Sequence, residues 1–210
     1  MVAFMQKSRG KRLRKRKKII FIGAEGKNKT ETKYFNSFNR LQDTYIVKFE
    51  RNNRTDPKGI ITGRNGDEVY VLLDADSEQY KKEQIKEAIS IGKNKNVNVI
   101  ISNPCFELWF LLHFEYTTKY FSSNRELIKE LKRYIKNYEK NLDVFTMLED
   151  KQMDALKNAK KLHSVHAETR KQLGYVQNPE TDIDILVDKM VEIGYNKYTG
   201  FFVKYEDAIS

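Results

Sequence analysis

Three acidic residues stand directly after apolar runs, in positions suited to metal-assisted chemistry. Glu25 follows the run 19–24, and Asp74 and Asp76 follow the run 69–73. If both runs are parallel strands of one sheet, their carboxyl ends share an edge, which is where open α/β sheets bind ligands. Clustered carboxylates repel one another, and their hard oxygen atoms suit Mg²⁺ or Mn²⁺. We therefore expect Glu25, Asp74 and Asp76 to hold a divalent metal for phosphodiester hydrolysis, with Glu25 as a ligand or as a general acid-base.

Glu107 is a fourth candidate for the same chemistry. It shares one helical stripe with Phe110, Leu111 and Phe114, so its carboxylate lies on an apolar face and needs a partner. It also falls in the first turn of the expected helix, where the helix dipole favours a negative charge. We expect it to bind the metal or to orient a ligand, and the alternative is a structural hydrogen bond to backbone amides.

The Asp-x-Asp pattern has other interpretations. Asp74 and Asp76 could simply cap the following loop and helix. Metal-binding Asp-x-Asp also ends a strand in glycosyltransferases and in haloacid-dehalogenase-like phosphatases. A metal-dependent phosphatase or nucleotidyl transferase acting on small substrates therefore stays open.

The elements that must position these acids alternate between strand and helix. Apolar and β-branched runs predict strands at 19–22, 45–49, 69–73 and 97–101, and helical spacing predicts helices at 30–41 and 83–92. The connection 52–68 barely accommodates a crossover helix, so we expect either a short helix near 58–62 or the second strand at an edge of the sheet. This order predicts an α/β fold with a mostly parallel sheet flanked by helices on both faces.

The second half of the chain is expected to be helical. Asn103 as N-cap and Pro104 as first helical residue would start a helix over 105–114 that is apolar nearly all round and hence deeply buried. Amphipathic helices are expected at 124–138, 150–171 and 183–193, the last with Thr181 and Asp184 as a capping box, and a weak strand at 200–205. We divide the chain into a basic flexible arm (1–18), an α/β core (19–115) and a helical extension packed on the core (116–210).

The net charge of +10 comes almost entirely from the amino-terminal arm, whose first 18 residues hold nine basic residues and no acid. Such a run attracts phosphate backbones through counterion release, although it could also be only a solvated arm. A second phosphate site is expected where the glycine loop meets a helix N-terminus, unless the lysines there are merely solvated. The residues expected to bind nucleic acid are Lys11, Arg12, Arg14, Lys15, Arg16, Lys27 and Lys29.

Several other classes of protein are disfavoured. No apolar run is long enough for a membrane span or a signal peptide, so we expect a cytoplasmic protein. The single cysteine, Cys105, allows neither an internal disulfide nor a cysteine-rich zinc site, and it lies about 12 Å from His113 along the expected helix, too far for a catalytic pair. We expect His113 to be a core histidine, His163 and His166 to cover a packed face, and the aromatic residues of the second half to be core.

Several segments together resemble a known family. They are Ala24-Glu25-Gly26, Thr30-Glu31, Tyr34-Phe35, Asp56-Pro57, Asp74-x-Asp76, the run Asn-Pro-Cys-Phe-Glu-Leu-Trp-Phe-Leu-Leu-His-Phe at 103–114, and Asn178-Pro179-x-Thr181. This pattern, over about 19–191, is similar to the RloB family, and the segment 103–114 is its most specific part. The amino-terminal region of that family is similar to Toprim domains, whose glutamate and Asp-x-Asp pair bind Mg²⁺.

The resemblance implies a function. RloB proteins are commonly linked to bacterial restriction or phage-defence loci, often beside an ATPase, which implies a defence nuclease acting on DNA or RNA, transfer RNA included. The alternative is a non-catalytic or partner-dependent nucleic-acid-binding subunit of an ATPase-containing complex. The long basic arm lies outside the resemblance.

Overall fold

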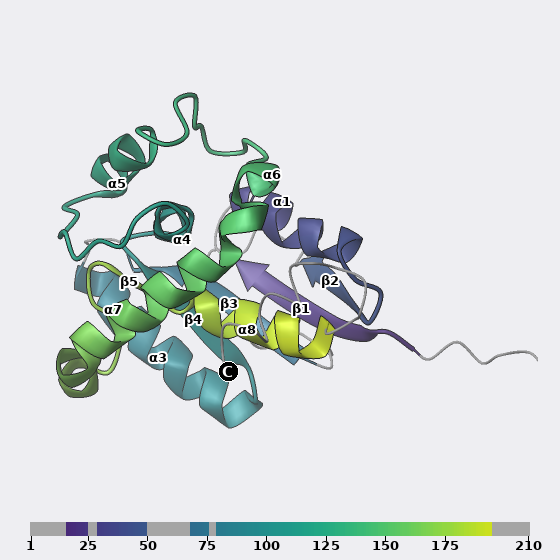
Figure 1. Ribbon diagram of the computed structural model, residues 1–210. Helices are drawn as coiled ribbons and strands as arrows, with labels where there is room; N and C mark the ends of the chain where they lie inside the picture. The colour runs from purple at the N-terminus through teal and green to yellow at the C-terminus, as the bar shows by residue number, and fades with distance from the viewer. Residues whose placement is uncertain (1–15, 25–28, 50–67, 76–78, 195–210) are drawn as a thin grey trace, which may run out of the picture.

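A mixed sheet forms the centre of the fold. The computed structural model describes residues 16–24, 29–49, 68–75 and 79–194, and within these it has a five-stranded sheet of order β2-β1-β3-β4-β5. Its strands are β1 (Lys18–Ala24), β2 (Tyr45–Phe49), β3 (Glu68–Asp74), β4 (Asn98–Asn103) and β5 (Glu180–Thr181). The first four run parallel, and β5 is antiparallel to β4 (Figure 1). The predicted α/β fold is confirmed, and β2 does lie at an edge.

Alternate residues of the strands enter two separate apolar clusters. Ile20, Ile22 and Leu72 face the larger cluster, which also holds residues of α1 (Lys29–Ser37) and α8 (Ile183–Gly194). Val71 and Leu73 face the smaller cluster under α3 (Gln79–Lys95). Because side chains alternate along a strand, runs apolar at every position bury both faces of the sheet, as the sequence predicted.

α4 (Glu107–Leu112) is buried at every residue, as expected, but begins later than predicted. Asn103 is the last residue of β4 and pairs with Glu180 of β5, so neither Asn103 as N-cap nor Pro104 as first helical residue is correct. Phe106 precedes the helix instead, and its N–H is held by a carboxylate from β3. Pairing with a strand from far along the chain thus keeps residue 103 extended.

The carboxyl-terminal half is helical, with one further strand. It contains α5 (Asn124–Leu131), α6 (Phe145–Leu148), the 3₁₀ turn η2 (Glu149–Lys151), the long α7 (Gln152–Leu173) and α8, while a further 3₁₀ turn, η1 (Phe38–Arg40), extends α1. α5 is shorter than predicted and passes into turns. The two-residue β5 was not predicted. The expected capping box of α8 is half formed. Thr181 Oγ1 accepts from Ile183 N, but the Asp184 carboxylate contacts His163 instead of the helix start.

One apolar cluster joins the two halves. α4 contacts both α5 and α7, and residues of all three lie in the larger cluster together with β1 and α1. Tyr34 of α1 accepts from the indole N–H of Trp109 (2.7 Å) and donates to Gln152 of α7 (2.7 Å). α4 is therefore the common packing partner of the sheet and the helical extension.

Candidate functional site

Asp74 lies at the carboxyl end of β3, where the sequence predicted a catalytic edge. Its Oδ1 accepts from the backbone N–H of Phe106 at 2.9 Å, the residue just before α4. The register of β3 against β4 brings the end of β3 next to the residues that precede α4. Asp74 pairs with Ser102, and Ala75 N donates to Ser102 O at 2.8 Å. One carboxylate oxygen is therefore fixed relative to the start of α4.

Glu107, the first residue of α4, has a side chain that is only 2% exposed. Its Oε1 accepts from the hydroxyl of Tyr138 at 3.1 Å and lies 3.8 Å from Nζ of Lys140. The prediction that this carboxylate needs a polar partner is confirmed. The partners are two side chains that follow α5.

A third carboxylate, from Glu31 of α1, lies in the same region. Glu31 and Asp74 both line a small cavity of about 20 Å³, room for roughly one water molecule. Burial raises the pKa of Glu31 to about 7, and the negative charge of Glu107 raises it further. A hydrogen bond to the backbone of Glu31 itself and the positive charge of Lys140 lower the pKa. The pKa of Glu31 thus depends on the charges of Glu107 on α4 and Lys140 after α5.

Lys140 is the cation that faces this group. Burial opposes its charge, but attraction by Glu107, Asp74 and Glu31 outweighs burial and raises its pKa. The segment around it is anchored to α1, because Lys33 Nζ donates to the carbonyl of Asn141. We call Glu31, Asp74, Glu107 and Lys140 the acid centre. With three carboxylates and one ammonium, its fully ionised charge is negative, which favours a further cation.

Comparison with known proteins bears on this arrangement. A family model described as RloB-like protein matches residues 20–190. The chain belongs to the RloB-like protein family. The match includes every residue of the acid centre. Neither a curated protein nor a solved structure gave a match to this RloB-like chain.

Only part of the predicted metal site falls within the described residues. Asp74 and Glu107 are there, and both raise the pKa of the buried Cys105 thiol by their charge, after burial itself, so both lie near that residue. Glu25 and Asp76 lie outside the described residues. Among those described, no three His, Cys, Asp or Glu side chains are placed to hold a metal ion. The oxygen donors of the acid centre suit a hard cation in kind, and a metal remains a prediction.

The predicted phosphate-binding residues are also divided. Lys29 is exposed at the start of α1, and Arg16 is exposed near the start of the described chain. Lys11, Arg12, Arg14, Lys15 and Lys27 lie outside the described residues, as does the expected strand at 200–205. No helix in the described part of the chain is both long enough and apolar enough to cross a membrane.

Two residues of the acid centre were not predicted as site residues. Glu31 entered the sequence analysis only within the Thr30-Glu31 motif, and that motif is the signal that could have singled it out. Lys140 carries no such signal, because it is one of many lysines and only the course of the chain after α5 brings it to Glu107.

His163 belongs to a separate ion cluster rather than to a packed face. Its Nδ1 lies 2.8 Å from Glu180 Oε1 and its Nε2 3.0 Å from Asp184 Oδ1. Both ring nitrogens face carboxylate oxygens, an arrangement that favours the doubly protonated imidazole. Burial alone would lower the pKa of His163, but Asp184 and Glu180 outweigh it and raise the pKa to about 9.

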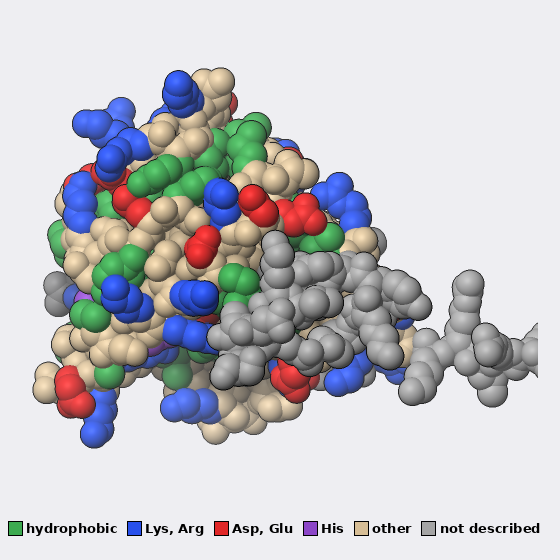
Figure 2. All heavy atoms as spheres, viewed as in Figure 1, with side chains coloured by type: hydrophobic (Ala, Val, Ile, Leu, Met, Phe, Trp, Pro, Cys, Tyr) green, Lys and Arg blue, Asp and Glu red, His purple; other side chains and the backbone are tan. Residues whose placement is uncertain are grey.

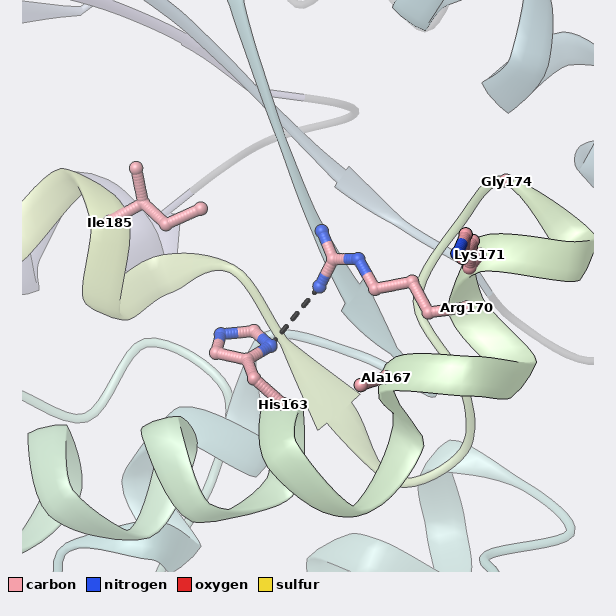
Figure 3. Close-up of a pocket in the computed structure, with 6 residues that line it drawn as sticks. All are labelled: His163, Ala167, Arg170, Lys171, Gly174 and Ile185. Carbon is pink, nitrogen blue, oxygen red and sulfur yellow. Dashed lines mark hydrogen bonds between the residues drawn. The ribbon is translucent and has the colours of Figure 1, made fainter.

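Arg170 completes this His163 ion cluster. It contacts Glu180 at 2.9 Å and Asp182 at 2.7 Å, and its Nη1 also lies 3.1 Å from His163 Nδ1 (Figure 3). Beside it lies a hollow of about 590 Å³ lined by His163, Ala167, Arg170, Lys171, Gly174 and Ile185. The cluster joins α7 to β5 and to the start of α8, so its evident role is to fix the carboxyl-terminal elements on the sheet.

The prediction for His113 is confirmed, and that for the aromatic residues of the second half is confirmed only in part. His113 is a core histidine whose Nδ1 lies 2.8 Å from the carbonyl of Trp109, and burial lowers its pKa to about 4. Cys105 is a buried free thiol. Phe121 and Tyr138 are buried in the core, while Tyr120 and Tyr134 are exposed and correct the prediction for those two.

Proposed function

We propose that this chain is a divalent-metal-dependent nuclease that hydrolyses phosphodiester bonds with the carboxylates at the end of β3. The observation that carries the proposal is the meeting of Asp74, Glu107 and Glu31 beside Lys140 at the carboxyl end of a central parallel strand. Such edges are where open α/β sheets bind their ligands. Membership of the RloB-like family supports the proposal, and the resemblance of its sequence motifs to those of Toprim domains agrees with it.

The side chains of the site would divide the work. Glu25, Asp74 and Asp76 would hold Mg²⁺ or Mn²⁺, with Glu107 assisting, and the metal when bound would neutralise phosphoryl oxygens and activate water. The Phe106 N–H fixes the orientation of the Asp74 carboxylate, and the Tyr138 hydroxyl fixes that of Glu107. Lys140 supplies a positive charge that could stabilise a phosphoryl group next to the carboxylates.

The test is cleavage of a panel of single-stranded DNA, duplex DNA, bulk RNA and transfer RNA, in Mg²⁺ or Mn²⁺ against EDTA. Asp74→Asn keeps a carbonyl oxygen that can accept from Phe106 N–H, so it should remove the negative charge while preserving the fold. We expect it to abolish cleavage with little change in stability. Asp154→Ala, at an exposed acid on α7, is the matched control and should cleave like wild type. Unchanged cleavage by Asp74→Asn would refute the proposed mechanism.

A second function is favoured by the family context, in which an ATPase often stands beside the RloB protein. In that case the chain is a nucleic-acid-binding subunit that acts in anti-phage defence only with its partner. Binding without cleavage by the isolated wild type would support this alternative. Turnover of a generic phosphomonoester would instead favour a phosphatase.

A further inference from the structure

The charged residues of α5 and the turns that follow it separate into two groups. The two acids of α5 are engaged. Glu126 accepts from Ser122 N and Oγ at 2.9 Å each and lies 3.1 Å from Lys119. Glu130 is paired with Arg133 and lies 3.6 Å from Lys119. The negative charges of these two residues are therefore already balanced by local partners.

Four further cations are left without such partners. Arg125, Lys129, Lys132 and Lys136 are all exposed, and none of them makes an ion pair with another described residue. Figure 2 shows Lys and Arg side chains gathered over α5, at the upper left of the view. The positive charge here is free to attract an anion from outside the chain.

The spacing of these four residues is that of one helical face. They stand at i, i+4, i+7 and i+11; Arg125 and Lys129 lie on α5, and Lys132 and Lys136 lie in the turns that follow it. Helical hydrogen bonds continue beyond α5, since Lys132 N donates to Ile128 O and Ile135 N to Leu131 O at 3.0 Å each. The opposite face, with Leu127, Leu131 and Ile135, is buried in the core. We call the four residues the basic stripe.

The surface along the stripe is hollowed. A depression of about 430 Å³ is lined by Ser123, Arg125, Glu126, Ile128, Lys129 and Lys132. Three of the four cations, Arg125, Lys129 and Lys132, line this depression, and Lys136 follows four residues further along the chain. Exposed cations grouped along a shallow hollow suit a uniformly charged phosphate backbone.

The basic stripe also leads to the acid centre. Tyr138 and Lys140 follow Lys136 by two and four residues, and both contact the buried Glu107 carboxylate. The chain therefore runs from a surface of free positive charge directly to the carboxylates.

We propose that the basic stripe is the surface on which this protein docks the phosphate backbone of its nucleic acid, guiding it toward the acid centre. This proposal rests on the proposed function for the identity of the ligand, but it needs no cleavage. Docking adds a phosphate contact for each of the four cations and releases the corresponding counterions.

The experiment measures binding of fluorescein-labelled 20-nucleotide single-stranded DNA, RNA and duplex DNA by fluorescence anisotropy, in EDTA, across a range of salt concentrations. The variant R125A/K129A/K132A/K136A is compared with the full-length wild type. The matched control K48A/K93A/K95A/K171A removes the same charge from exposed positions on β2, α3 and α7. All eight replaced side chains are exposed, and alanine is well tolerated at the helical positions among them, so both variants should fold.

We expect the slope of log K against log[salt] to fall in magnitude by about 3 for the stripe variant, at roughly 0.7 to 0.9 for each lost phosphate contact. The control should change by less than 1. Equal changes in both variants, or none in the stripe variant, would overturn the proposal. Equally tight binding of poly-glutamate by the wild type would overturn it in favour of an acidic protein partner.

The same measurements keep the two proposals apart. If the stripe variant loses binding while Asp74→Asn has no cleavage defect, the docking proposal is supported and the nuclease mechanism is refuted. If Asp74→Asn abolishes cleavage but the stripe variant binds and cleaves normally, the nuclease mechanism is supported and docking at this stripe is refuted.

Discussion

Replacing His163 with glutamine should destabilise the fold strongly near pH 6 and only weakly near pH 10. The carboxylates of Glu180, Asp182 and Asp184 and the guanidinium of Arg170 surround the ring, and the pKa of His163 is raised from 6.5 to about 9. The folded state therefore binds its proton more tightly than the unfolded state does. The resulting stabilisation is fully present below pH 6.5 and disappears as pH rises through 9.

The size of the effect follows from the same shift. The rise of the His163 pKa from 6.5 to about 9 corresponds to roughly 3 kcal/mol. The side chain is 23% exposed, so solvent screening is limited. His163→Gln should therefore lower the free energy of unfolding by up to about 3 kcal/mol at pH 6.

The assay is urea unfolding at pH values from 6 to 10, followed through the fluorescence of the single buried tryptophan, Trp109. The difference between wild type and His163→Gln should shrink between pH 7 and 9. His166→Gln, on the same helix but outside the ion cluster, serves as the control for a histidine-to-glutamine change on α7. A wild-type-minus-variant difference that stays constant from pH 6 to 10 would refute the reasoning.

Three other substitutions test features of the fold by urea unfolding at neutral pH. Tyr138→Phe removes the hydroxyl that donates to the buried Glu107 and should cost about 2 kcal/mol, whereas no loss would show that this contact is not formed. Gly174→Ala should lower the free energy of unfolding by about 1 kcal/mol. A Cβ there would meet no atom within 4 Å, but the backbone φ of +79° is unfavourable for alanine. Tyr34→Phe leaves the Trp109 indole N–H without its acceptor and should cost about 1 to 3 kcal/mol; an unchanged midpoint would contradict that bond.

The sequence was sufficient to predict the centre of the sheet because β1 and β3 are buried on both faces. Runs such as 69–73 are apolar at every position, a pattern that helices on the surface do not show. It was not sufficient for β5, where Glu180 and Thr181 form a strand only because β4 offers an edge to pair with. The start of α4 was misplaced for the same reason, since that pairing holds Asn103 in the strand.

The candidate site was predictable only where acids follow strands or lie on an apolar helical face in the sequence. Asp74 was found in the first way, Glu107 was found as a carboxylate on an apolar helical face, and the structure brings them both close to Cys105. Lys140 enters through a contact across more than thirty positions of the chain, and its charge state depends on the carboxylates it meets there. Such contacts are set by the path of the turns after α5, which no local pattern encodes.

The complete burial of α4 has a consequence for how the molecule unfolds. Trp109, Phe110, Leu111 and Leu112 are each 0% exposed, and their neighbours come from α1, α5 and α7. A chain ended at residue 115 would present this helix to water on the sides that α5 and α7 now cover, and would be expected to aggregate. The α/β part and the helical extension should therefore melt together, in a single transition by calorimetry, as one cooperative unit.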